Sequence, residues 1–199
     1  METVSFRQMK DGTREDYALL ERLEQEYVDG LPDRVLEALR GLDHTLSGYQ
    51  VTRLEHSLQT ATRAEDDGAD EDMVLGALLH DLGDDLAPAN HSQYAAAIIE
   101  PYVRAEVTWI VAHHGVFQKY YYADKVGEDP NERERYRDHP WFDSCEYFCE
   151  RWDQAAFDPD YPTRPLEHFE PLVRRMFARE PFDPAVIHPH GETASAQRA

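Results

Sequence analysis

The fold is decided by the stretch Ala77-Leu78-Leu79-His80-Asp81-Leu82-Gly83-Asp84. Its apolar residues predict a buried helix that runs to Asp84. His80 and Asp81 lie at the end of the apolar run, where a carboxylate without a partner would cost roughly several kcal/mol to bury. A bound cation is the simplest explanation for that carboxylate. The stretch therefore predicts a buried metal site.

A histidine from the preceding segment reaches the same place by the geometry of a helix hairpin. Asp67-Gly68-Ala69 is a turn signal between two helical patterns. His56 lies 12 residues before Gly68, and His80 lies 12 residues after it. In an antiparallel hairpin both side chains are then at the same level, roughly 18 Å from the turn at 1.5 Å per residue. We expect two histidine ligands to converge there.

A second hairpin repeats this arrangement around Pro101, which is a natural break between two helices. His91 lies 10 residues before Pro101, and His113 and His114 lie 12 and 13 residues after it. Histidines from both hairpins and at least one carboxylate would meet between the helix pairs, a common place for metal sites in helical proteins. These are more donor groups than one metal usually needs.

Composition narrows the classes of partner. The 199 residues include 20 basic and 40 acidic side chains, for a net charge of −20, which repels nucleic acids and anionic membrane surfaces. The N-terminal residues lack the pattern of a signal peptide, and no apolar stretch approaches the length of a spanning helix. Cys145 and Cys149 are expected to be reduced core residues. We expect a cytoplasmic protein whose partners are small molecules, and its oligomeric state stays open.

The remaining patterns predict an all-α protein with one helical domain over residues 1–182 and a loosely ordered tail over 183–199. His188 and His190 lie in that tail and are poor ligand candidates. Two N-terminal helices, from Thr13 to about Val28 and from Leu31 to Gly41, are expected to serve packing.

The metal-binding core is expected to cover about residues 51–153. A later helix begins near Pro140, and its apolar face includes Trp152. Asp153 lies at the edge of that face and is a plausible inward-pointing carboxylate.

The order of His56, His80-Asp81 and Asp153 resembles the H…HD…D pattern of the HD-domain superfamily of helical metalloproteins. With His91 and His114, the order is similar to that of dinuclear members. This resemblance implies that Asp81 bridges two metals. It assigns His56, His80 and Asp153 to one metal and His91 and His114 to the other, with His113 as the alternative to His114.

A closer resemblance lies in Val51-Thr52-Arg53-Leu54-Glu55-His56-Ser57-Leu58-Gln59-Thr60-Ala61. This segment is similar to the first-ligand helix of the mixed-valent diiron oxygenases that cleave organophosphonates. Inositol oxygenase belongs to the same broader group. The resemblance implies an Fe(II)/Fe(III) pair that binds substrate oxygen atoms and O2. Ligation by nitrogen and oxygen atoms alone suits iron.

The sequence departs from those relatives at the substrate side. Leu46 and Tyr49 stand where the relatives have a gating tyrosine and glutamate, and Tyr49 is a candidate gate. The lysine that holds the anionic substrate comes one residue late, at Lys119. Phosphonate is therefore a doubtful substrate. The expected substrate-binding side chains are those of Lys119, Gln118, Arg53 and Gln59.

Three function classes remain. The first is an oxygenase whose reactive site is shielded by Phe117, Tyr120 and Trp152. The second is a phosphohydrolase in which Mn or Mg ions activate water and Asp84 serves as general base or orienter. The third is a metal-stabilised scaffold without turnover. Hydrolysis should require several basic side chains around the phosphate, and the segment around the ligands is poor in them, which favours oxidation.

Overall fold

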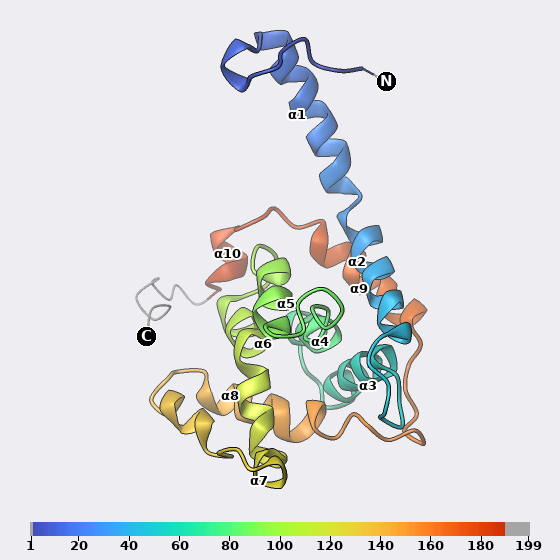
Figure 1. Cartoon of the computed structure of the whole chain (residues 1–199), viewed down its shortest axis with the longest axis vertical. Helices are drawn as coiled ribbons and strands as arrows, with labels where there is room; N and C mark the ends of the chain where they lie inside the picture. Colours follow the sequence, from blue (N-terminus) through green and yellow to red (C-terminus); the bar gives the residue numbers. More distant parts are fainter. Residues whose placement is uncertain (1, 190–199) are drawn as a thin grey trace.

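A computed structural model describes residues 2–189, and within them every regular element is helical, as the sequence predicts. The central pair is α3 (Arg53–Asp66) and α4 (Glu71–Leu79), which pack against each other. A second pair, α5 (His91–Ile99) and α6 (Ala105–Gln118), lies beside them (Figure 1). No helix in the described part of the chain is long and apolar enough to cross a membrane.

Helix α4 lies at the centre of the core because almost all of its side chains are apolar. Seven of its residues, Met73 to Leu79, are buried. Gly76 lets it approach α6 closely, since a Cβ atom there would lie 2.6 Å from Val107 Cγ1. The helix ends at Leu79, and His80 is its C-cap. The sequence predicted a helix to Asp84, but tight turns follow instead, including a hydrogen bond from Leu82 N to Leu79 O.

After α6 the chain leads through several short helices back to the two helix pairs. Short helices η3 (Lys119–Tyr121), α7 (Ala123–Val126) and η4 (Glu132–Tyr136) lead into α8 (Phe142–Phe148). The last turn widens into the π-helix η5 (Cys149–Asp153), which contacts both α3 and α6. This placement brings Asp153 to the junction of the two hairpins.

Further helices complete the molecule. Helix α2 (Leu31–Gly41) packs against α9 (Leu166–Phe177), and 3-10 turns form at η1 (Met9–Asp11) and η2 (Leu42–His44). The tail prediction covers residues 183–199. Its described part contains the short α10 (Pro184–Ile187), which has no buried residue, and residues 190–199, with His190, lie outside the described residues.

The N-terminal helix α1 (Arg14–Asp29) departs from the packing role expected for it. Thr13 and Asp16 form a capping box at its start. The helix nevertheless extends away from the other helices (Figure 1), and its only buried residue is Asp16. Its apolar stripe of Tyr17, Leu23, Tyr27 and Val28 is exposed, with Tyr27 65% and Val28 44% accessible. Only the end of α1 contacts α2.

Candidate metal centre

Four histidines point their Nε2 atoms into one buried space between the helix pairs. In three of them the Nδ1 atom must carry the proton, because its partner is a backbone carbonyl oxygen that can only accept. These hydrogen bonds measure 2.9 Å from His56 to Ala156, 2.8 Å from His80 to Ala77, and 2.7 Å from His114 to Val111. In the neutral form of each ring, Nε2 therefore presents its lone pair to the space, as in metal-binding histidines.

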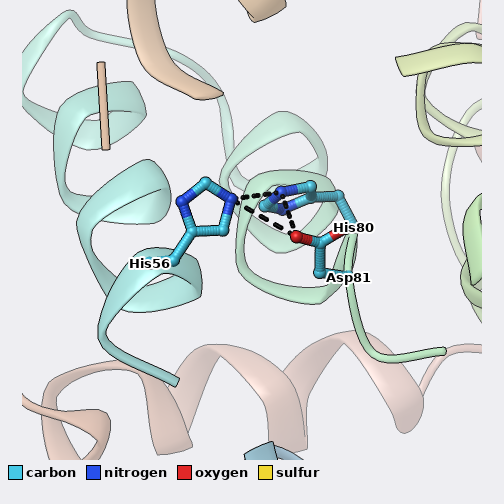
Figure 2. Close-up of side chains that lie close together, drawn as sticks. All are labelled: His56, His80 and Asp81. Atoms are coloured by element: carbon cyan, nitrogen blue, oxygen red, sulfur yellow. Dashed lines mark hydrogen bonds and ion pairs between the residues drawn. The ribbon is translucent and has the colours of Figure 1, made fainter. Parts of the chain in front are cut away.

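Figure 2 shows the first part of this cluster. His56 on α3 points toward His80 at the end of α4, and the Asp81 carboxylate lies beside both rings. The two Nε2 atoms are 3.0 Å apart. Two nitrogens bound at right angles to one ion, each at about 2.1 Å, would have a separation of about 3.0 Å. The equal spacing of the two histidines from Gly68 has brought them together as predicted.

The Asp81 carboxylate faces two pairs of histidines with its two oxygens. Oδ2 lies 3.3 Å from Nε2 of His56 and 3.3 Å from Nε2 of His80. Oδ1 lies 3.4 Å from Nε2 of His91 and 3.2 Å from Nε2 of His114. A carboxylate in this position can contribute one oxygen to each of two ions.

Asp153 completes the cluster from η5. Its Oδ1 lies 3.3 Å from His56 Nε2 and accepts a 2.9 Å hydrogen bond from Gln118 Nε2. Its Oδ2 is buried without any hydrogen-bond partner. An unsatisfied buried carboxylate oxygen is costly, and a cation removes that cost. The orphaned oxygen is thus a specific sign that the residues fit an ion.

The protonation equilibria reflect how strongly these groups interact. Burial alone would raise the pKa of Asp81, but His80 and hydrogen bonds from neighbouring histidines hold that pKa well below its usual value. Burial alone would lower the pKa of His80, but Asp81 and Asp153 raise it well above its usual value. The Asp81 carboxylate is therefore charged, and positive charge from protonated imidazoles or from metal ions balances it in this buried space.

Three overlapping sets of side chains have ligand atoms within 4.8 Å of one another. They are His56 with His80 and Asp81, His80 with His114 and Asp153, and Asp81 with His91 and His114. Nitrogen and carboxylate oxygen donors without thiolates suit iron or manganese. The donor set fits the two-metal expectation, and the individual ligand assignments remain proposals.

The structure separates the two adjacent histidines of α6. His114 is buried and faces Asp81. His113 instead donates its Nδ1 proton to the Trp109 carbonyl at 2.7 Å and stacks on the Trp109 ring. His114 is therefore the one that the fold brings to the cluster.

The polar residues expected around the substrate make other contacts. Arg53 pairs with Asp81 and with Asp84, and Lys119 lies 3.0 Å from Glu128 and 3.1 Å from Glu132. Gln118 holds Asp153, as described above.

Gln59 is buried and exchanges hydrogen bonds with the backbone of Asp158. It thereby fixes the loop that follows η5. Tyr49 stacks on Phe157 of that loop at a ring distance of 5.1 Å, and Phe157 stacks on His56 at 4.3 Å. Tyr49, half exposed, thus lies two rings from the cluster.

The aromatic lining differs from the expected one. Phe117 packs against Phe142, Tyr120 carries the Arg133 guanidinium on its face, and the Trp152 indole donates to Asp67. The rings that contact the histidines are instead Phe148, beside His80 and His114, and Phe157. Phe148 is a buried residue of α8, whereas Phe157 follows in a loop whose path hydrophobic periodicity does not predict.

Two comparisons with known proteins found similar sequences. Residues 53–139 match the HD domain family. The chain is also 29% identical over 182 residues, 76% of its length and 89% of the relative, to a [1-hydroxy-2-(trimethylamino)ethyl]phosphonate dioxygenase (glycine-betaine-forming) from Leisingera caerulea. The HD-domain match contains His56, His80-Asp81, His91 and His114, whereas Asp153 lies beyond it.

Proposed function

We propose that this chain, whose residues 53–139 match the HD domain family and which is similar to a phosphonate dioxygenase, is a dinuclear-iron oxygenase. It would use O2 to oxidise or cleave a small polar substrate, either hydroxylated or anionic. The observation that supports the proposal most directly is Asp81, each of whose carboxylate oxygens faces a separate pair of histidine nitrogens.

The protein residues have distinct tasks in this proposal. His56, His80 and Asp153 would hold one ion, His91 and His114 the other, and Asp81 both. The bound iron pair supplies coordination of substrate oxygen and electron transfer to O2. Backbone carbonyls keep the proton of three histidines on Nδ1, so that Nε2 stays available. Phe148 and Phe157 cover the imidazole rings and limit access of water to them.

The substrate would approach from the end of α6. Gln118 and Lys119 lie there, and Gln118 already contacts Asp153. Because Glu128 and Glu132 neutralise Lys119, an anionic substrate must displace those carboxylates to pair with it. This favours a polar hydroxylated group, with at most a modest anionic contribution, as the part of the substrate that the protein recognises.

The test is the iron content and electron paramagnetic resonance (EPR) spectrum of protein produced with iron. We expect about two irons per chain and a mixed-valent diiron signal after partial reduction. His114→Asn should lose that signal, and the matched control His113→Asn should keep it, because the two neighbours face different surroundings. One iron or none in well-folded wild-type protein would contradict the dinuclear proposal.

A metal-dependent phosphohydrolase is the alternative, since the same ligands bind Mn or Mg and the HD domain match admits it. Asp84 would be its general base, but this carboxylate is paired with Arg53. Arg53 and Lys119, the expected anion-binding cations, are both engaged by carboxylates. Robust phosphatase activity with Mn, without a mixed-valent signal, would select the hydrolase.

A further inference from the structure

Arg53 occupies a position that helix formation does not explain. It is the first residue of α3, directly after the N-cap Thr52. The N-terminus of a helix carries partial positive charge and favours acidic rather than basic side chains. The Arg53 side chain is also only 11% exposed, although arginines are rarely buried unless they are paired.

Its guanidinium joins two carboxylates from the turn after α4. Nε donates to Asp84 Oδ2 at 2.5 Å, and Nη2 donates to Asp81 Oδ2. A carboxylate oxygen has two lone pairs, so Asp81 Oδ2 can accept this hydrogen bond and still face His56 and His80. The planar guanidinium of one side chain therefore links the first turn of α3 to the segment that contains Asp81.

The second carboxylate bound by Arg53, that of Asp84, also contacts His91. Asp84 Oδ1 lies 3.5 Å from His91 Nδ1, while Asp84 Oδ2 contacts Arg53. The three other histidines of the cluster donate Nδ1 to backbone carbonyls of fixed position. His91 faces a movable carboxylate instead, and its side chain is the most exposed of the four at 27%. Its orientation depends on what holds Asp84.

We propose that Arg53 is a positioning residue of the two-metal centre, which aligns Asp81 directly and His91 through Asp84. It thereby controls occupancy of the His91 and His114 side. The inference rests on the proposed dinuclear function. It gives Arg53 a role other than the substrate binding expected from the sequence.

Direct titration of the metal-free protein with Mn(II), by calorimetry and metal analysis, tests this role. We expect two ions per chain in the wild type. In Arg53→Gln the ion on the His91 side should bind 10- to 100-fold more weakly, as is typical when an outer partner of a ligand is lost. The ion on the His56 and His80 side should be weakened less, because His56, His80 and Asp153 keep their own hydrogen-bond partners. Asp84→Asn should produce the same selective loss.

Two further variants sharpen the result. Arg53→Lys keeps the charge but cannot span both carboxylates with a planar fork, so it should bind the second ion with intermediate affinity. Arg40→Gln removes an arginine that pairs with Glu170 away from the cluster, and it should bind both ions normally. If Arg53→Gln fails to fold by circular dichroism, Asp84→Asn provides the decisive titration.

The opposing outcomes are distinct. Two ions bound by Arg53→Gln and by Asp84→Asn with wild-type affinity would overturn the positioning role. If methylphosphonate changes the EPR signal of the wild type, and Arg53→Gln binds both ions normally but loses that change, Arg53 binds the anion and is not a positioning residue. Fewer than two ions in the wild type would instead refute the proposed dinuclear function.

Discussion

The metal centre depends on the small size of Gly83. A Cβ atom at this position would lie 2.6 Å from His91 O and 2.7 Å from His91 Cα. Both are backbone atoms at the start of α5, so the clash cannot be relieved by a side-chain rotation. Gly83→Ala must therefore move His91 away from Asp81. We expect a loss of about 1–3 kcal/mol in the free energy of unfolding, typical of overpacking, together with weaker binding of the second ion.

Urea unfolding and Mn(II) titration would measure both effects of Gly83→Ala. The matched control is Gly41→Ala, because Gly41 is the last residue of α2 and nothing lies within 4 Å of an added Cβ there. That variant should be neutral or slightly stabilised. Wild-type stability and metal binding in Gly83→Ala would show that the turn around Gly83 moves to accommodate the methyl group while His91 keeps its place.

At the scale of single elements, two helices start with the same capping box but differ in what they support. Thr52 with Glu55 caps α3, and Thr13 with Asp16 caps α1. Helix α3 carries His56 in the core, so Thr52→Ala should lower the free energy of global unfolding by about 1 kcal/mol. Thr13→Ala should only fray the projecting α1. Chemical denaturation and amide hydrogen exchange distinguish the two, and equal global losses would contradict the projecting arrangement.

The start of α1 is also expected to respond to acid. Backbone hydrogen bonds from Thr13 and Ser5 lower the pKa of Asp16 from 3.8 to about 2. Because the folded pKa is below the unfolded one, this contribution is fully present above about pH 4. It should disappear as the pH falls toward 2. NMR titration of the Asp16 carboxyl carbon, with loss of amide protection in the first turn of α1, would test this, and an ordinary pKa would refute it.

At the scale of the whole molecule, the sequence predicts those features of the fold that depend on the local spacing of apolar residues. The all-α class follows from the apolar spacing, and the meeting of His56 and His80 follows from their equal distances to Gly68. The contact between Arg53 and Asp84 does not follow, because it depends on the exact turn after His80 that replaces the predicted last helical turn.

Two other features that the sequence did not predict have a similar physical origin. The exposure of the α1 stripe depends on the direction in which α1 leaves α2, and periodicity gives only its amphipathic pattern. Phe157 reaches His56 because Gln59 holds the loop backbone, a contact across 99 residues of sequence. Hydrophobic patterns thus predict helices and their inward faces, whereas long-range polar contacts determine how loops complete the site.

The whole fold should be stabilised by metal, because the ligands come from α3, the end of α4, α5, α6 and η5. Unfolding disperses these groups, so an ion bound only by the native state adds about 2.7 kcal/mol at 100 times its dissociation constant. For a domain of this size the midpoint of thermal unfolding should rise by roughly 5–11 °C. Calorimetry of EDTA-treated protein with and without Mn(II) measures the shift. Asp153→Asn should reduce it, because the orphaned oxygen that needs the ion is gone. An unchanged midpoint at saturating Mn(II) would mean that these helices meet for reasons other than metal binding.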